Sequence, residues 1–109
     1  MIALTEDKRM LGYGVMTPYS NIFCFATTRR GGFSKGDYAS FNCTPYTGDD
    51  AESVRRNQEL LCNPMPQQPK ELVIPFQTHG TKVEVIDEKY LNATSDERTV
   101  MLQGVDALI

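Results

Sequence analysis

Glycine and proline divide this chain into short segments, and this division most limits the folds that the chain can adopt. Eight glycines and six prolines are spread over 109 residues, and both residue types interrupt helices and strands. The two longest uninterrupted segments are residues 49–63 and 81–103. The sequence therefore predicts short strands joined by loops, with few and short helices.

One helix is predicted directly after Gly48. Asp49 or Asp50 can cap its first amide groups, and Glu52 falls in the first turn, where the helix dipole favours an acid. Asn63-Pro64 ends it. The apolar residues recur at roughly helical spacing, which predicts one inward face made of Ala51, Val54, Leu60 and Leu61. Residues 88–103 are polar and suit a short helix followed by a loop.

The strand candidates are short runs of β-forming residues between breakers. Residues 21–28 predict a buried strand, and residues 82–87 alternate as a strand does. Pro75 makes residues 71–76 an edge strand or a strand end. The remaining signals are weaker. Residues 11–19 predict a loop or a short edge strand, and residues 38–46 predict a short strand around Ser40–Cys43. Residues 104–109 predict a final apolar strand.

Composition and charge exclude several classes of protein. A length of 109 residues allows one domain, and 40% hydrophobic with 23% charged residues is ordinary for a soluble globular domain. No run approaches the roughly 18 apolar residues of a membrane span, and the first residues lack a secretory signal. The net charge of −3 argues against a general nucleic-acid binder. We expect a cytoplasmic protein that binds neither membranes nor nucleic acid.

The three cysteines support the same location. Cys24, Cys43 and Cys62 are an odd number and contain no C-x-x-C pair, so neither a disulfide framework nor a zinc ribbon can be built from them. Reduced thiols are the better interpretation.

A glycine-rich loop carries the early positive charge. Residues 1–48 hold five Lys and Arg against three acids, whereas residues 49–109 hold six against eleven. In Arg29-Arg30-Gly31-Gly32, glycine amides could point at one oxyanion while an arginine grips it in a bidentate way. The spacing is neither a Walker motif nor G-x-G-x-x-G, so a solvated turn with two exposed arginines is an equal alternative.

His79 is the single histidine, and it falls in a turn between two predicted strands. Loops at strand ends often carry function, although an isolated histidine is more often an ordinary surface or core residue. One imidazole cannot make a metal site or a catalytic dyad by itself. The acids at 49, 50 and 52 suit helix capping better than metal binding, and we expect the aromatic residues to be core: Phe23, Phe25, Phe33, Tyr38 and Phe41.

Several short motifs together resemble one known family. In chain order they are Thr27-Thr28-Arg29, Gly31-Gly32-Phe33-Ser34, Tyr38-Ala39-Ser40-Phe41-Asn42, Gly48-Asp49-Asp50, Asn57, Gln77-Thr78-His79-Gly80-Thr81-Lys82-Val83 and Gly104-Val105-Asp106-Ala107-Leu108. This order resembles the YfiH family, also called the multicopper polyphenol oxidase (laccase) domain, whose members are now regarded as purine nucleoside phosphorylases. The resemblance covers about residues 22–109.

The resemblance implies an α+β fold, a three-layer α/β/α domain with mixed sheets. Family members are longer and continue into T-A-D-C and H-x-G-W segments, so residues 1–109 are expected to be one domain, the N-terminal half of a longer YfiH-like domain. The implied reaction is the phosphate-dependent cleavage of adenosine or inosine, which releases the base and ribose 1-phosphate. Adenosine deamination and methylthioadenosine cleavage are ascribed to the same site, and a monomer is favoured.

The resemblance also implies a zinc site and suggests roles for particular residues. In the family a histidine of the Q-x-H-G motif, here His79, binds zinc together with a cysteine and a second histidine that this chain lacks; its three cysteines do not match that ligand. From loop chemistry and motif position, Arg29 is the candidate for holding phosphate, Arg30 is second choice, and Asn42 is a candidate for orienting substrate. A copper-dependent oxidase of phenols and an inactive truncated module remain as alternatives.

Overall fold

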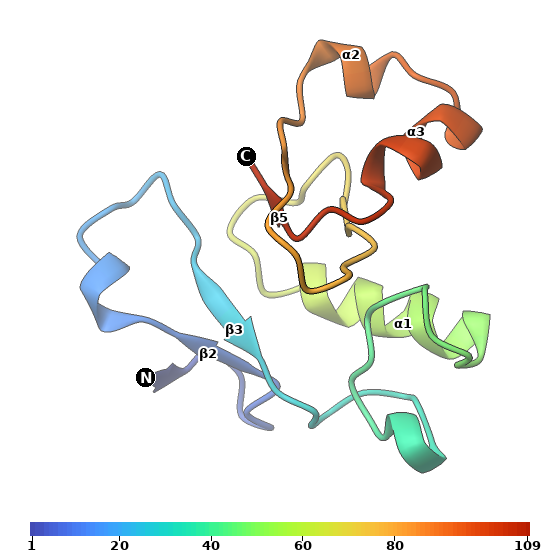
Figure 1. The fold of residues 1–109 in the computed structure, drawn as a ribbon. Helices are drawn as coiled ribbons and strands as arrows, with labels where there is room; N and C mark the ends of the chain where they lie inside the picture. Colours follow the sequence, from blue (N-terminus) through green and yellow to red (C-terminus); the bar gives the residue numbers. More distant parts are fainter. The chain divides into compact units, whose positions relative to one another are not determined.

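The computed structural model describes all residues from Met1 to Ile109 and contains both helices and sheets, which confirms the α+β class. The chain forms two compact units, Met1–Lys70 and Glu71–Ile109, and each is described by itself (Figure 1). None of its helices has the length and apolar character that crossing a bilayer requires.

The first unit contains a three-stranded antiparallel sheet. Strand β2 (Met10–Gly12) lies between β1 (Ile2–Ala3) and β3 (Phe25–Thr27), with Leu11 opposite both Ala3 and Ala26. The prediction of a loop or edge strand for residues 11–19 was therefore wrong for its first residues, which form the end of the central strand; a 3-10 turn, η1 (Gly14–Met16), follows. Strand β3 is shorter than the predicted residues 21–28 because β2 offers it only three partners.

Helix α1 (Ala51–Cys62) confirms the helix predicted after Gly48. Asp50 is the capping residue, and its carboxylate accepts a hydrogen bond from the Ser53 amide at 2.9 Å. Val54 and Leu61 are buried as the spacing predicts, whereas Ala51 at the first helical position is exposed.

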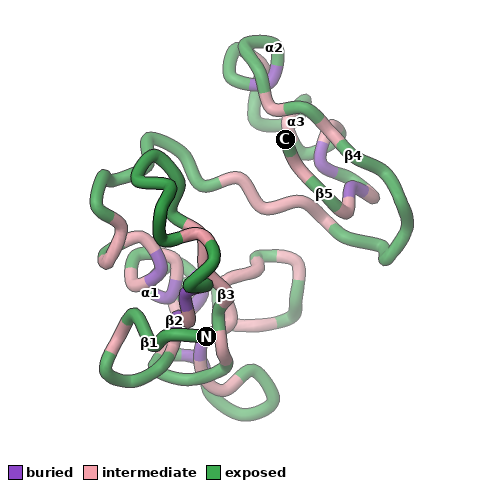
Figure 2. Tube along the Cα trace, turned by 90° about the vertical axis from the view of Figure 1, so that its left-hand side faces the viewer, coloured by how far each residue is buried: buried purple, intermediate pink, exposed green.

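The core of the first unit joins the sheet to the helix. Met10, Phe41 and Leu61 are buried together, and partly buried side chains of Phe25, Cys43, Leu60 and Met65 pack against them. Figure 2 shows these buried stretches on β2 and α1.

The expectation that all five aromatic residues are core was wrong for three of them. Phe23, Phe33 and Tyr38 are each more than a third exposed. The Arg56 guanidinium covers the Phe33 ring at 3.8 Å from its centroid, and the Tyr38 hydroxyl accepts a hydrogen bond from the Gly48 amide at 3.1 Å. Both rings therefore stabilise the surface of the loop region, where a polar partner is within reach.

The predicted strand around Ser40–Cys43 is also absent. A 3-10 turn, η2 (Gly36–Tyr38), leads into this segment, and turns follow it. The amides of Ser40 and Phe41 both donate to the carbonyl oxygen of Arg29, at 2.7 and 3.1 Å. Because one oxygen takes both bonds, the segment cannot form a regular ladder.

The second unit is built around a short parallel strand pair. Strands β4 (Val83–Glu84) and β5 (Ala107–Leu108) pair in parallel, within the predicted residues 82–87 and 104–109. Residues 71–76 form no strand; only an isolated bridge joins Phe76 to Gln103, and Pro75 lacks the amide that a ladder needs.

Two helices fill the polar segment of the second unit, where one helix and a loop were predicted. They are α2 (Glu88–Leu91) and α3 (Ser95–Leu102), capped by Asp87 and Thr94. Tyr90, Leu102 and Val105 are the buried side chains of this unit.

Candidate functional site

The loop after β3 folds back on itself at Arg29. The Arg29 carbonyl oxygen accepts the two amide bonds described above and a third bond from the Ser40 hydroxyl at 2.9 Å. That hydroxyl in turn accepts the Gly32 amide at 3.1 Å. A Cβ at Gly32 would overlap the Ser40 carbonyl and lie 2.5 Å from the Cα of Phe41. Only glycine therefore allows the two arms of the loop, residues 29–34 and 39–42, to approach this closely.

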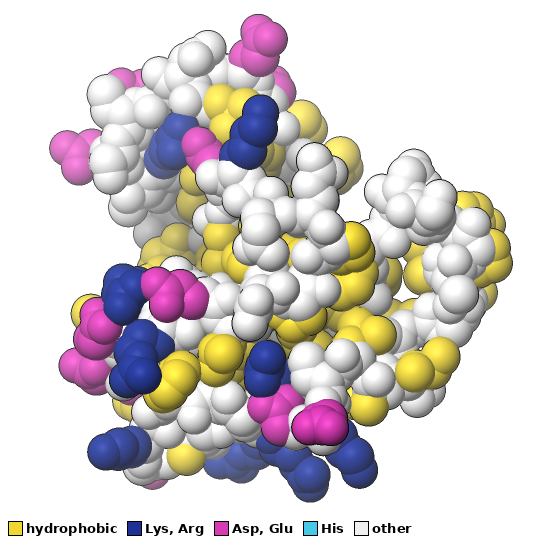
Figure 3. All heavy atoms as spheres, turned by 180° about the vertical axis from the view of Figure 1, so that it is seen from behind, with side chains coloured by type: hydrophobic (Ala, Val, Ile, Leu, Met, Phe, Trp, Pro, Cys, Tyr) yellow, Lys and Arg dark blue, Asp and Glu magenta, His cyan; other side chains and the backbone are white.

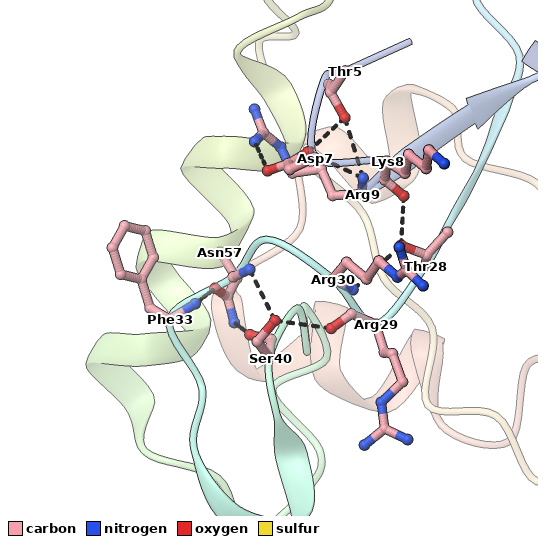
Figure 4. Close-up of polar contacts among 11 residues, drawn as sticks. Thr5, Asp7, Lys8, Arg9, Thr28, Arg29, Arg30, Phe33, Ser40 and Asn57 are labelled. Carbon is pink, nitrogen blue, oxygen red and sulfur yellow. Dashed lines mark hydrogen bonds and ion pairs between the residues drawn. The ribbon is translucent and has the colours of Figure 1, made fainter. Parts of the chain in front are cut away.

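An open hollow of about 370 Å³ lies on this loop and brings together two residues that sequence reasoning singled out. Arg29 and Asn42 both line it, together with Asp37, Tyr38, Ala39 and Phe41. Arg30, the second choice for holding phosphate, is not among the lining residues. Figure 4 shows the Arg29 guanidinium pointing away from the hydrogen-bonded cluster of Ser40 and Asn57.

The guanidinium of Arg29 is anchored at one side and free at the other. Its Nε donates to the Ala39 carbonyl oxygen at 3.1 Å, and its two terminal nitrogens make no hydrogen bond or ion pair within the chain. Lys and Arg side chains also gather at the lower edge of the molecule in Figure 3, with acidic side chains beside them. The free fork is the geometry that binds a carboxylate or phosphate in a bidentate way.

Asn42 is tied into a small polar network instead. Its Nδ2 donates to the Thr47 hydroxyl at 2.9 Å and to Asp49 Oδ2 at 3.2 Å, and its Oδ1 accepts the Thr44 amide at 3.3 Å. Both amide protons are therefore used, and only a second lone pair on Oδ1 is left for a ligand.

Asp49 joins that network to the buried Ser34. The Ser34 hydroxyl donates to Asp49 Oδ2 at 2.5 Å. This bond, with those from Asn42 and from the Asp50 amide, holds the pKa of Asp49 below its ordinary value. Hydrogen bonds to a carboxylate stabilise its charged form. Asp49 is therefore an anion, and it connects Ser34 in one arm of the loop to Asn42 in the other.

His79 lies in a turn of the second unit that Asp106 holds from both sides. Its backbone is left-handed, with φ of 59°, and its side chain is exposed. The Asp106 carboxylate accepts the Thr78 amide at 3.2 Å and the Gly80 amide at 2.9 Å. The backbone directly before and after the histidine is therefore fixed, and the imidazole is presented to solvent.

The donor atoms present do not make a complete metal site. No group of three or more His, Cys, Asp or Glu side chains is placed to hold an ion. His79 can supply one imidazole, but a catalytic zinc needs three protein ligands. Zinc or copper therefore does not fit these residues alone.

The cysteines are free thiols, all three half-buried. Burial, with a smaller effect of the neighbouring Cys62, raises the pKa of Cys43 to about 11; burial also raises the pKa of Cys62. Both groups therefore stay protonated near neutral pH, which makes them poor metal ligands because a metal binds the thiolate.

Three residues that organise these loops were named in the sequence only as members of motifs, and no role was assigned to them. Asn57 and Ser34 are buried polar residues, and Asp106 holds the His79 turn. One signal was available for Asn57, since it falls between Val54 and Leu61 on the inward face of the predicted helix. Asp106 stands in the motif Gly104–Leu108, but that motif does not indicate its role, because its hydrogen-bond partners lie 26 and 28 residues away.

Comparisons with known proteins cover most or all of the chain. Residues 23–109 match a family described as "Multi-copper polyphenol oxidoreductase laccase". A purine nucleoside phosphorylase of Bacteroides thetaiotaomicron is 62% identical over all 109 residues, which span 40% of its length. An adenosine deaminase, RL5, from an unknown prokaryotic organism is 38% identical over 78% of this chain and 32% of its own. A purine nucleoside phosphorylase of Corynebacterium glutamicum is 39% identical over 76% of this chain and 31% of its own.

No solved structure matches the chain. The chain spans less than half the length of each of these curated relatives. The family match nevertheless covers residues 23–109, including both the loop of Arg29 and the turn of His79. The chain therefore belongs to the multicopper polyphenol oxidoreductase (laccase), or YfiH-like, family.

Proposed function

We propose that these 109 residues are the N-terminal part of a purine nucleoside phosphorylase, in which phosphate cleaves the bond between sugar and base of adenosine or inosine and gives the free base and ribose 1-phosphate. The observation that carries the proposal is the free fork of Arg29 on the hollow that Asn42 also lines. The relatives named purine nucleoside phosphorylase support it from outside the chain.

In this proposal Arg29 binds the phosphate that attacks the sugar. Its anchored Nε fixes the plane of the guanidinium, and its terminal nitrogens donate two parallel bonds to the anion. An anion bound this way is oriented before the reaction, which lowers the entropic part of the barrier. Both amide protons of Asn42 are already used, so Asn42 cannot donate to a ligand. Its Oδ1 has a free lone pair and can accept a hydrogen bond from a substrate hydroxyl.

We further propose that His79 is one ligand of a zinc ion whose remaining ligands come from residues beyond this chain. The exposed imidazole and the fixed turn beneath it support this assignment. When bound, zinc would supply a Lewis acid and an ionised water, which suits adenosine deamination in particular. The relative named adenosine deaminase favours that second activity, and methylthioadenosine cleavage is proposed at the same site.

The three free thiols bear on where the protein works. We place it in the cytoplasm, where its three free thiols would stay reduced, and we propose a monomer that binds nucleoside and phosphate but not nucleic acid or membranes. A copper-dependent oxidase of phenols is the alternative that the family's description favours.

The test uses the full-length protein with inosine, with and without phosphate, together with metal analysis and a phenol-oxidation assay. The proposal expects hypoxanthine release that requires phosphate. Arg29→Ala should raise the KM for phosphate strongly and weaken adenosine deamination much less, because only phosphorolysis uses the anion. Arg30→Ala serves as the neighbouring comparison, with a smaller effect expected since Arg30 does not line the hollow. Phenol oxidation without nucleoside cleavage would favour the copper alternative.

A further inference from the structure

Asn57 is a fully buried polar side chain on a helix face that otherwise packs apolar residues. It is 0% exposed and lies between the buried Val54 and Leu61 on α1. A buried amide is costly unless its hydrogen bonds are made. An apolar residue would extend the inward face more simply, so the bonds of Asn57 indicate what the side chain contributes.

Every one of those bonds goes to the loop of the candidate site. Oδ1 accepts the Phe33 amide at 2.7 Å. Nδ2 donates to the Ser34 hydroxyl at 2.9 Å and to the Asn42 carbonyl oxygen at 2.7 Å, with a longer contact to the Ser40 carbonyl oxygen at 3.4 Å. Figure 4 shows Asn57 between Phe33 and Ser40. One side chain therefore bonds to both arms of the loop.

The spacing of these two arms sets where the groups on the hollow lie. The Arg29 guanidinium is anchored on Ala39 in the opposite arm, and the side chain of Asn42 follows directly from the carbonyl that Asn57 holds. If the arms separated, the Arg29 guanidinium would lose its anchor on Ala39 and would move away from Asn42. Ser34 connects the same cluster to Asp49, which Asn42 also contacts.

We propose that Asn57 is a positioning residue for anion binding, which holds the two arms of the loop so that the Arg29 guanidinium stays anchored on Ala39 and faces one phosphate. The proposal rests on the proposed function for its substrate, inorganic phosphate. Asn57 itself does not touch the ligand, because it is buried. Its effect is expected on phosphate more than on the nucleoside.

The chain offers a matched control on the next residue of the same helix. Gln58 also reaches from α1 to the loop, where its Nε2 donates to the Cys43 carbonyl oxygen at 2.9 Å. Gln58→Ala removes one bond from helix to loop without touching the two arms. It should leave phosphate binding and turnover near those of the wild type.

The experiment compares Asn57→Ala, Ser34→Ala and Gln58→Ala in the full-length protein. The readouts are the Kd for inorganic phosphate by calorimetry, the KM for phosphate and for inosine, and the circular dichroism spectrum. Asn57→Ala should raise the phosphate Kd and KM by about tenfold, equivalent to about 1.4 kcal/mol, while the KM for inosine changes little. Ser34→Ala deletes one hydroxyl and leaves the other bonds of Asn57, so it should act in the same direction with a smaller effect.

Each outcome decides the proposal. If Asn57→Ala fails to fold, Ser34→Ala provides the answer. Folded Asn57 and Ser34 variants with wild-type phosphate affinity would overturn the positioning role, and so would a Gln58→Ala variant that weakens phosphate equally. A wild-type protein that does not bind phosphate also overturns it. If the wild type binds phosphate but does not cleave inosine, the proposed function fails, and the Kd values still judge the role of Asn57.

Discussion

Replacing Asp106 with alanine should release the turn that carries His79. The carboxylate accepts hydrogen bonds from the amides on both sides of the histidine, at 3.2 and 2.9 Å. Each such bond contributes about 0.5–1.5 kcal/mol net, so the pair stabilises the turn by about 2 kcal/mol. Against this, the left-handed backbone of His79 costs a non-glycine residue about 1–2 kcal/mol.

Because the hydrogen bonds of Asp106 and the backbone strain at His79 nearly cancel, the cost of removing Asp106 should depend on which residue stands at position 79. In the wild-type background, Asp106→Ala should lower the free energy of unfolding by less than about 1 kcal/mol, because the turn relaxes and the backbone strain at His79 is released. In a His79→Gly background no strain is stored, so the same substitution should cost the full value of about 2 kcal/mol. Urea unfolding of the four full-length proteins measures both values.

The relaxed turn should also lose its ability to present the imidazole. Metal analysis of full-length Asp106→Ala should therefore find less zinc than in the wild type. Asp87→Ala is the matched control, because Asp87 caps α2 by accepting the Lys89 amide at 3.1 Å and accepts no hydrogen bond from the turn. It should cost about 1 kcal/mol and keep the metal. Equal costs of Asp106→Ala in both backgrounds, with full zinc retained, would refute the reasoning.

Four further predictions concern the loop, the pH dependence and the isolated chain. Gly32→Ala should destabilise the protein by about 2 kcal/mol or more through overpacking and weaken phosphate binding, whereas Gly14→Ala, whose new Cβ would meet nothing closer than 3.9 Å, should change neither; thermal unfolding and phosphate titration check this. The lowered pKa of Asp49 means that its stabilisation is present above the unfolded value of about 3.9 and is lost as the pH falls through the folded value, so Asp49→Asn should flatten the acid side of the stability curve. The pKa of Cys43, raised to about 11, predicts that stability falls as the pH rises from about 8.5, the ordinary thiol value, toward the folded value; Cys43→Ala should remove that loss in alkaline urea unfolding. The purified 109-residue chain should release no hypoxanthine from inosine and phosphate, with or without added zinc, because His79 alone cannot hold the metal; zinc-dependent release at an enzymatic rate would show that no further residues are needed.

Local signals were enough to predict α1 but not the loop that it holds. A cap, an acid in the first turn and apolar spacing all lie within residues 49–63, so the helix could be predicted from its own sequence. The segment 38–46 has strand-forming residues, yet the amides of Ser40 and Phe41 bond to the carbonyl oxygen of Arg29, eleven and twelve residues earlier. Such a long-range partner leaves no periodic pattern in the sequence.

The candidate site likewise contains residues that could be chosen from the sequence and residues whose roles could not. Arg29, Asn42 and His79 could be chosen from their residue types and motif positions, and the structure places the first two on one hollow. The residues that hold them, Asn57 and Asp106, act through backbone amides and carbonyls. Both residues stand in the motifs quoted from the sequence, but backbone partners cannot be identified from side-chain chemistry, so the roles of these two residues emerge only from the fold.

The most direct test of the central claim follows the fate of the sugar. The full-length protein is incubated with inosine and phosphate, and the products are separated to distinguish ribose 1-phosphate from free ribose. We predict ribose 1-phosphate and hypoxanthine in equal amounts, no product without phosphate, and a strongly raised KM for phosphate in Arg29→Ala. Free ribose formed equally well without phosphate, or no cleavage of any purine nucleoside by the metal-loaded protein, would contradict the account.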